Sequence, residues 1–254
     1  ILSRVYLTMG EDAKAVSAAT DAIAGDGSDI ASISDFSKIF TTSMEVPEVL
    51  FRIAITADNG YLPGNDWGQG SESSYIANYS VTYSLNELYK STDIRRSQIK
   101  LVNGGAYNVV WKYNNGGKST GLIDIPIIRA SEVYLTRAEA NYNLKNYDDA
   151  LSDLNLVKER RYSDYEEGTE SGAALEKEIQ LQRRLELAFE GHRFFDLKRR
   201  HEDVQRDGKG FMADGLECYR FSHCLKSGTR SVLTNASSPS ARGGWSTTLI
   251  RLPE

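Results

Sequence analysis

The stretch RRLELAFEGHRFFDLKRR (residues 183–200) alternates charged and apolar residues along a predicted helix. Glu186 and Glu190 are four residues apart, so they share one face of that helix. Each acid has an arginine three residues away, Arg183 before Glu186 and Arg193 after Glu190. An arginine at that spacing lowers the pKa of a carboxyl group and makes it a poor general acid. The spacing therefore favours a buried or half-buried ion-pair network over the carboxylate pair of a glycosidase.

Composition limits the class of protein. The chain has 254 residues, of which 40% are hydrophobic, so a substantial core can form. Its 35 acids outnumber its 30 bases and leave a net charge of -5, which argues against general nucleic-acid binding, since that needs a basic face. No apolar run approaches the roughly 20 residues of a transmembrane helix.

Both ends of the sequence suggest a fragment of a longer precursor. The opening ILSRVYLTMG has the pattern of a helix interior without a preceding capping residue, and the closing TTLIRLPE ends within an extended segment. We therefore expect a single domain over residues 1–254 that lacks its N-terminal part. A signal peptide is not visible, and in a fragment this says nothing about export.

Apolar residues recur at helical spacing over 1–24, from 130 to about 160, and over about 173–200. Two segments, LTMGEDAKA (7–15) and YNLKNYDDA (142–150), align without a gap, and each is predicted to join two antiparallel helices through a tight turn. Tetratricopeptide-like repeats of about 34 residues use this arrangement. The sequence therefore predicts a mainly α fold, with a tetratricopeptide-like helical-repeat scaffold, long loop insertions and a few short strands.

Three segments have the composition of strands. Residues 46–55, 107–113 and 120–128 are rich in β-branched and aromatic side chains. The turn Asn114-Asn115-Gly116-Gly117 is expected to join the last two as a hairpin.

Residues 58–83 form a long predicted loop that is rich in glycine, asparagine, serine and aromatic residues. Long ordered loops commonly carry function. Flat aromatic rings pack on the C–H faces of sugars, while amide and carboxylate groups bind sugar hydroxyls. We therefore predict a ligand-binding loop at 58–83, although ordinary packing would explain the same aromatics. The candidate residues are Trp67, Tyr61, Tyr75, Asn65, Asp66, Tyr79 and, on a predicted strand where aromatics usually belong to the core, Trp111.

Little in the sequence indicates a metal or cofactor. Asp58, Asn59, Asn65 and Asp66 could ligate calcium, but their spacing fits no EF-hand loop. The three histidines are scattered, and no phosphate-binding or dinucleotide-binding motif is present. We expect no cofactor, no metal and no catalytic residue.

The two cysteines, Cys218 and Cys224, are too few for a disulfide scaffold. They also lack the two further ligands that a structural zinc site needs. They are two free thiols or one local bridge, and the bridge is favoured if the protein is exported.

Several motifs, in order along most of the chain, resemble the SusD/RagB family. Its C-terminal signature combines an arginine and a helix leading to alanine-glutamate-alanine, a second helix ending in arginines, and then glutamate-leucine, aromatic-glutamate-glycine, arginine and aspartate-leucine. Gln182 departs from the pattern, since the family commonly has glutamate there, and this weakens one ion pair. The matching residues are Arg129, Glu132-Val133-Tyr134-Leu135, Ala138-Glu139-Ala140, Arg160-Arg161, Glu186-Leu187, Phe189-Glu190-Gly191, Arg193 and Asp196-Leu197.

The resemblance implies a SusD-like fold whose C-terminal signature region spans 130–200 and whose earlier repeat helices span 1–24. It implies a non-catalytic, surface-exposed lipoprotein of the outer membrane that binds oligosaccharides or polysaccharides. The lipidated N-terminal cysteine of the family is absent from this fragment. The expected partner is a SusC-like TonB-dependent transporter barrel. The signature itself is expected to be scaffold, and because family binding residues lie on variable loops, none is carried over by motif.

Two other classes remain as alternatives. A helical-repeat adaptor that binds only proteins would have a dry, packed 58–83 loop. A glycoside hydrolase would have an unpaired carboxylate pair facing a cleft.

Overall fold

The computed structural model describes residues 1–25, 28–41, 46–56, 58, 63–69, 76–77, 79, 81–102, 107–114 and 121–204. The chain divides into two compact units, Ile1–Arg220 and Phe221–Glu254, and every described residue belongs to the first. A single domain over 1–254 stays a prediction. Cys218 and Cys224 lie outside the described residues.

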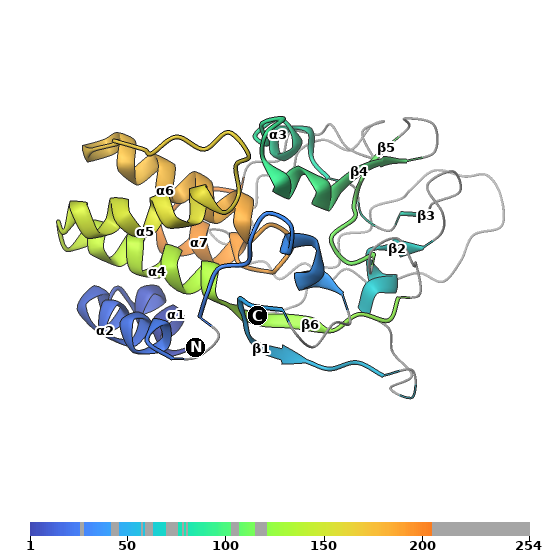
Figure 1. Cartoon of the computed structure of the whole chain (residues 1–254), viewed down its shortest axis with the longest axis horizontal. Helices are drawn as coiled ribbons and strands as arrows, with labels where there is room; N and C mark the ends of the chain where they lie inside the picture. Colours follow the sequence, from blue (N-terminus) through green and yellow to red (C-terminus); the bar gives the residue numbers. More distant parts are fainter. Residues whose placement is uncertain are drawn as a thin grey trace, which may run out of the picture. The chain divides into compact units, whose positions relative to one another are not determined.

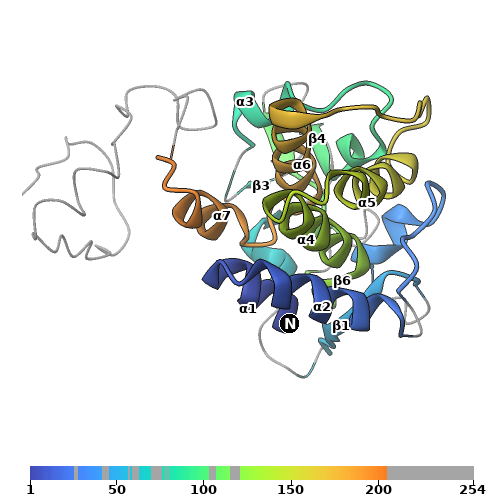
Figure 2. The same ribbon diagram turned by 90° about the vertical axis from the view of Figure 1, so that its left-hand side faces the viewer.

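The fold is mainly α, as predicted. Within the first unit, the long helices lie together on one side and the short strands on the other (Figure 1). Viewed from the helical side, α1 and α2 pack beneath α4 and α5, and α6 lies above them (Figure 2). The helices are α1 Leu2–Met9, α2 Asp12–Ile23, α3 Tyr83–Asn86, α4 Ala130–Asn143, α5 Tyr147–Glu159, α6 Gly172–Glu186 and α7 Arg193–Arg199, with 3-10 helices η1 Phe36–Phe40, η3 Pro63–Asp66 and η4 Ile94–Gln98.

The two aligned segments, 7–15 and 142–150, are confirmed as the connections of two matched helical hairpins. Gly10 follows α1 with φ +74°, and Lys145, its counterpart in the aligned segments, lies between α4 and α5 with φ +67°. The alanines that follow at equivalent positions, Ala15 and Ala150, are completely buried. A left-handed residue reverses the chain and an alanine lets two helices approach closely, so the same local pattern produces both hairpins.

In the described part of the chain the strands form three two-stranded antiparallel ribbons, and the predicted hairpin across 114–117 is wrong. The strand after residue 120 pairs with the one that follows Pro47, and residues 107–110 pair with 99–102. Each of these two strands therefore pairs with another segment, and not with the strand on the other side of residues 114–117. The pairs are β1 Val49–Ile53 with β6 Ile125–Arg129, β2 Gly68–Gln69 with β3 Ile76–Ala77, and β4 Ile99–Val102 with β5 Tyr107–Val110.

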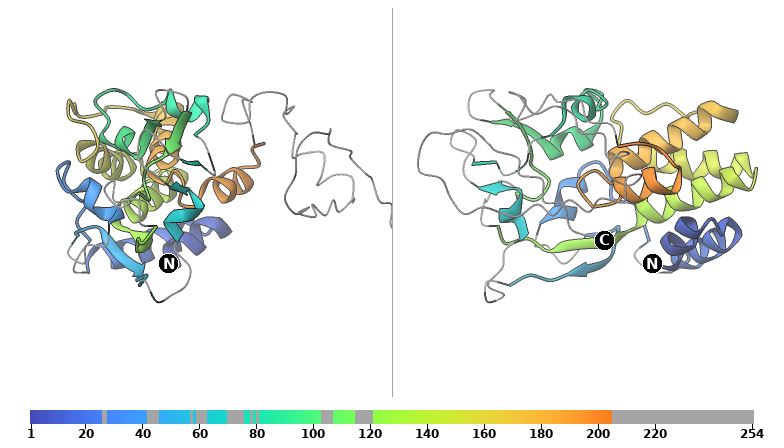
Figure 3. Two further views of the ribbon diagram at one scale, coloured as in Figure 1. Left: turned by 90° about the vertical axis from the view of Figure 1, so that its right-hand side faces the viewer. Right: turned by 180° about the vertical axis from the view of Figure 1, so that it is seen from behind.

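The single helix predicted over about 173–200 is also wrong, because the chain turns between α6 and α7. Figure 3 shows α7 from behind, running beside α6 and α4 rather than continuing α6. Phe189 and Gly191 both have positive φ, +68° and +82°, which ends helical geometry within this turn. Residues 187–192 therefore form a loop in which the Phe189 carbonyl oxygen and the Glu190 carboxylate reach Tyr113 and Lys112, which follow β5.

Eight charged side chains, here called the ion cluster, join the two sides of the unit. Every side chain is at most 7% exposed. Four are acids and four are bases, so the formal charges cancel. Because they come from six separate segments of the chain, the cluster fixes where the helices meet the strands. The members are Glu48, Asp93, Arg95, Lys112, Arg129, Arg161, Glu186 and Glu190.

Glu186 is the centre of the ion cluster. Its Oε1 accepts hydrogen bonds from Arg129 Nη1 at 2.8 Å and Arg161 Nη2 at 3.0 Å, and its Oε2 accepts from Arg161 Nε at 2.9 Å and Arg95 Nη1 at 3.4 Å. Burial by itself would raise the pKa of Glu186. The three guanidinium groups outweigh that effect and hold the pKa well below its usual value.

The ion-pair network is confirmed, but the local partners expected from sequence spacing are wrong. Arg183 pairs with Glu139 at 3.3 Å and Asp196 at 3.2 Å rather than with Glu186. Glu190 binds Arg129 and Lys112, whereas Arg193 is exposed. Since the chain turns after Glu186, helical spacing no longer decides which charges meet.

Replacing Glu186 with glutamine removes one charge from the cluster and keeps the side-chain shape. The three buried guanidinium groups then lose one negatively charged partner. We therefore expect the free energy of unfolding to fall by about 3–5 kcal/mol. Urea unfolding measures the change. Glu176→Gln, at an exposed position of the same helix, is the control and should change little. Equal small effects in both variants would contradict the central role of Glu186.

The cluster also predicts how stability depends on pH. The pKa values of Glu186, Glu190 and Asp196 are lowered in the folded protein, because nearby basic groups overcome the effect of burial. Unfolded glutamate and aspartate titrate near about 4.3 and 3.9. Below about pH 4.5 the unfolded chain therefore binds protons that the folded protein does not, and stability falls as pH falls. A urea midpoint that stayed constant from about pH 7 to pH 3 would contradict this account.

Candidate functional site

The predicted ligand-binding loop places Trp67 in an aromatic cluster. Its ring stacks on Tyr113, with centroids 5.3 Å apart and 22° between the planes. It also makes edge-to-face contacts, with its ring centroid 5.9 Å from that of Phe189 and 5.7 Å from that of Tyr79. Trp67 is half-buried while Tyr79 is 59% exposed, so this cluster reaches the protein surface at Tyr79. Exposed aromatic rings with a polar edge, such as that of Tyr79, are of the kind that pack against sugar rings.

Tyr113 connects this aromatic cluster to the ion cluster. Its hydroxyl donates to the carbonyl oxygen of Phe189 at 3.0 Å, in the turn between α6 and α7. Burial raises the pKa of Tyr113 well above its usual value, so the hydroxyl remains a donor. The ring centroids of Tyr113 and Phe40 are 6.1 Å apart. The ammonium group of Lys112 lies 4.4 Å from the Phe40 ring centre. A continuous series of contacts thus runs from the buried charges to Tyr79.

Two glycines hold the loop in place beneath Trp67. The backbone N–H of Gly64 donates to the carbonyl oxygen of Gly121 at 3.1 Å. A Cβ on Gly64 would lie 2.9 Å from that same oxygen, and one on Gly121 would lie 1.9 Å from Asn65 Oδ1. Gly121 also has φ +66°. The close approach of these two segments therefore requires glycine on both sides.

The candidate residues separate into two groups. Asn65, Asp66 and Trp67 share one turn, where Asn65 faces Gly121 and Asp66 is exposed, and Tyr79 contacts the Trp67 ring. Trp111 is not in that turn. It packs on Val102 of β4 and Val109 of β5, with the Lys100 ammonium 4.9 Å from its ring centre. Tyr61 and Tyr75 lie outside the described residues.

Sequence reasoning missed Tyr113 and Phe189. Tyr113 ends a segment that resembles a core strand, and Phe189 belongs to a signature motif that we expected to be scaffold only. Phe189 is in fact part of the aromatic cluster, because the turn that delivers Glu190 to Arg129 also brings Phe189 to Trp67. No local pattern in the sequence indicates this contact.

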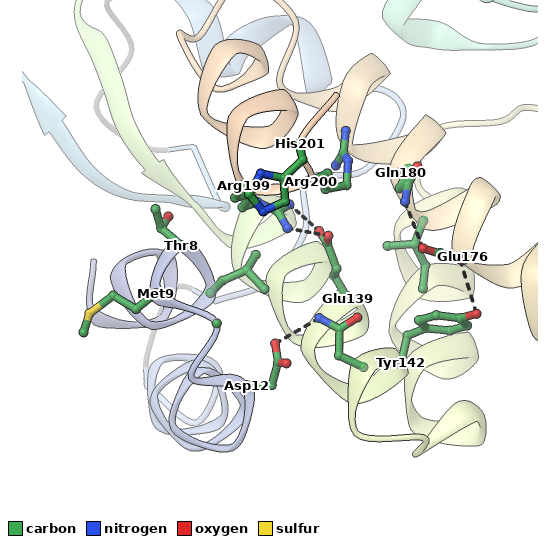
Figure 4. Close-up of a pocket in the computed structure, with 14 residues that line it drawn as sticks. Thr8, Met9, Asp12, Glu139, Tyr142, Glu176, Gln180, Arg199, Arg200 and His201 are labelled. Atoms are coloured by element: carbon green, nitrogen blue, oxygen red, sulfur yellow. Dashed lines mark hydrogen bonds and ion pairs between the residues drawn. The ribbon is translucent and has the colours of Figure 1, made fainter. Parts of the chain in front are cut away.

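A pocket of about 420 Å³ lies on the helical side, among α1, α4, α6 and α7 (Figure 4). Its polar side chains bind one another: Arg199 donates to Glu139 at 2.6 Å, and Asn143 donates to Asp12 at 3.0 Å. Apart from His201, Tyr142 is its single aromatic lining residue. This lining suits a sugar ring less well than the Trp67 cluster does.

A second pocket, of about 440 Å³, lies on the β side. It is bordered by η1, the junction of η4 and β4, and the residues that follow β5, and Trp111 contributes to its lining. Across the described ranges, no group of three histidine, cysteine, aspartate or glutamate side chains could hold a metal ion. Nor does any helix in those ranges combine the length and apolar character needed to cross a bilayer.

The comparison with protein families decides the family. The SusD family model matches residues 55–223, about two thirds of the chain. This chain belongs to the SusD family. A search of the curated proteins finds no match.

Solved structures share the SusD fold. A SusD superfamily protein from Bacteroides thetaiotaomicron is 26% identical with a TM-score of 0.71, over 82% of this chain and 50% of that one. A SusD-like carbohydrate binding protein from Bacteroides vulgatus is 25% identical with a TM-score of 0.66, over 81% and 45%. Surface glycan-binding protein A from B. thetaiotaomicron, in complex with laminarihexaose, is 21% identical with a TM-score of 0.63, over 79% and 53%, and shows the fold alone. The chain spans about half the length of the solved structures it matches.

The glycine contact beneath Trp67 can be tested with Gly121→Ala. The new Cβ would displace Asn65, so we expect the loop to shift and the Trp67–Tyr113 stack to loosen. Near-ultraviolet circular dichroism should report the change in the tryptophan environment.

The matched control is Gly10→Ala. Gly10 also has positive φ, but a Cβ there meets nothing within 4 Å. Both variants should lose about 1–2 kcal/mol of stability from backbone strain. Only Gly121→Ala should alter the near-ultraviolet spectrum, and identical spectra for both variants would show that Gly121 does not position Trp67.

Proposed function

We propose that this chain binds glycans at the cell surface, without transforming them, for uptake through a TonB-dependent outer-membrane transporter. The observation that carries the proposal is Trp67, fixed by Tyr113 and Phe189 beside the exposed ring of Tyr79. The stack fixes the Trp67 ring before any ligand arrives, and such preorganisation reduces the entropy lost on binding.

The polar groups near this aromatic cluster suit a hydroxyl-rich ligand. Asp66 is exposed one residue before Trp67, and its carboxylate can accept hydrogen bonds from sugar hydroxyls. Membership of the SusD family and likeness to a SusD-like carbohydrate binding protein support the same ligand class.

The state of the two signature carboxylates supports a non-catalytic role. Glu186 is completely buried and bound by three arginines, and Glu190 is bound by Arg129 and Lys112. Burial would raise the pKa of Glu190, but these two cations lower it overall. A glycosidase needs one carboxyl group that remains protonated to act as general acid. Neither glutamate can serve as that acid at neutral pH.

The partner and location follow from the family resemblance. We infer a SusC-like transporter barrel as partner, an outer-membrane position exposed at the cell surface, and anchoring by an N-terminal lipid. In this arrangement the Trp67 cluster captures a glycan and the barrel imports it.

Trp67→Ala tests the proposal directly. The full-length protein would be run by affinity electrophoresis through gels containing laminarin, xylan, galactomannan, amylopectin or polygalacturonate. We expect at least one glycan to retard the parent protein. Trp67→Ala should weaken that binding about tenfold or more, a loss of about 1.4 kcal/mol.

Phe194→Ala is the matched control, because Phe194 is an aromatic residue of α7 that is 51% exposed on the helical side. Its binding should equal that of the parent. Retardation that survives Trp67→Ala would keep glycan binding and move the site away from the loop. No retardation on an extended glycan panel would favour the protein-binding adaptor.

A further inference from the structure

The pocket on the β side contains a polar group with no partner. Gln98, at the end of η4, is 3% exposed, and neither its Oε1 nor its Nε2 makes a hydrogen bond within the described part of the chain. Buried polar side chains are almost always hydrogen-bonded, so such a group needs an explanation. Gln98 belongs to the lining of this pocket, and since both carboxamide atoms are covered in this structure, a ligand in the pocket reaches them once the neighbouring side chains shift aside.

The backbone holds Gln98 at this position. Its carbonyl oxygen accepts hydrogen bonds from the backbone N–H groups of Trp111 at 2.7 Å and Lys112 at 3.1 Å. These bonds join the end of η4 to the residues that follow β5. Gln98 and Trp111 are therefore fixed beside each other at the pocket.

The walls of the pocket combine aromatic and aliphatic surface with hydroxyl groups. Trp111 is half-buried, and the Lys100 ammonium lies 4.9 Å from its ring centre, so the lysine stem runs along the same wall. None of the lining residues is acidic. The lining is Phe36, Ser37, Phe40, Ser97, Gln98, Ile99, Lys100, Trp111 and Lys112.

Lys112 belongs to the ion cluster rather than to a ligand. Its ammonium group is completely buried and donates to Glu190 and to the carbonyl oxygen of Ala188 at 2.9 Å. Burial lowers the pKa of Lys112 to about 8. Its charge is balanced within the protein, which leaves the Gln98 carboxamide as the buried group that can recognise a ligand.

We propose that this pocket is a second carbohydrate subsite, which holds one sugar ring against Trp111 and binds two adjacent hydroxyls through the Gln98 carboxamide. A carboxamide offers one acceptor and one donor side by side, and neighbouring hydroxyls of a sugar offer the complement. A purely apolar ligand would leave the carboxamide unpartnered and would be disfavoured. The volume of about 440 Å³ lies within the roughly 300–1,000 Å³ of small-molecule sites.

The subsite deepens the proposed function and rests on it. Tyr79, Tyr113 and Phe189 contact the Trp67 ring, and none of these three described residues lines this pocket. The chain would therefore hold a glycan at two separate points. Two linked contacts bind a long chain much more tightly than a short one, because the second contact becomes intramolecular.

Gln98→Leu tests the subsite. It removes the carboxamide at nearly constant volume, and because that group makes no hydrogen bond, the thermal midpoint should stay the same or rise. We expect about tenfold weaker binding of the glycan that retards the parent protein, measured by calorimetry at constant temperature and salt. Gln180→Leu, on the helical side, is the matched control and should bind as the parent does.

The outcomes separate this inference from the proposed function. If Trp67→Ala loses binding while Gln98→Leu binds as the parent, the second subsite is wrong and glycan binding stands. If Gln98→Leu lowers the thermal midpoint by several degrees, its carboxamide has a structural partner and the inference also fails. If no glycan of the extended panel binds the parent, the proposed function and the subsite are both rejected.

Discussion

The carboxylate of Glu186, shared by Arg95, Arg129 and Arg161, is the interaction on which the rest of the unit depends. Taking charges out of water is costly, and such clusters contribute little net stability compared with apolar packing. Breaking one is nevertheless expensive, because the remaining charges lose their partners. The ion cluster therefore acts mainly by permitting one arrangement of the segments that supply its eight members.

That arrangement determines where the candidate site lies. Arg129 stands between β6 and α4, and it binds both Glu186 and Glu190. Both acids reach one guanidinium group although the chain leaves helical geometry after α6, and Phe189 adopts positive φ in the resulting turn. Its carbonyl oxygen and its ring then hold Tyr113 and Trp67. A signature that the sequence suggests is scaffold thus also supports one wall of the aromatic cluster.

The sequence predicts those features of the fold that depend on residues close together in the chain. Each of the two hairpins has a turn residue and an alanine at matching positions, Gly10 with Ala15 and Lys145 with Ala150. Alignment of the two short segments is therefore enough to predict both hairpins. The structural role of Glu186 and Glu190 followed from nearby arginines, although their real partners come from distant segments. The strand pairing of 107–110 and the turn at 187–192 could not be predicted, because each depends on residues that meet only in the folded chain. The same holds for the site: Trp67 and Tyr79 were identified by composition, whereas Tyr113 and Phe189 were not.

The central claim is that a glycan binds at the Trp67 ring, which Tyr113 and Phe189 hold in place next to the ion cluster. A crystal structure of the full-length protein, soaked with the glycan that retards it in electrophoresis, tests this claim most directly. We expect electron density for a sugar ring against Trp67 and Tyr79, with Tyr113 still stacked on the opposite side of the indole. Density elsewhere on the molecule, with the Trp67 cluster unoccupied, would contradict it.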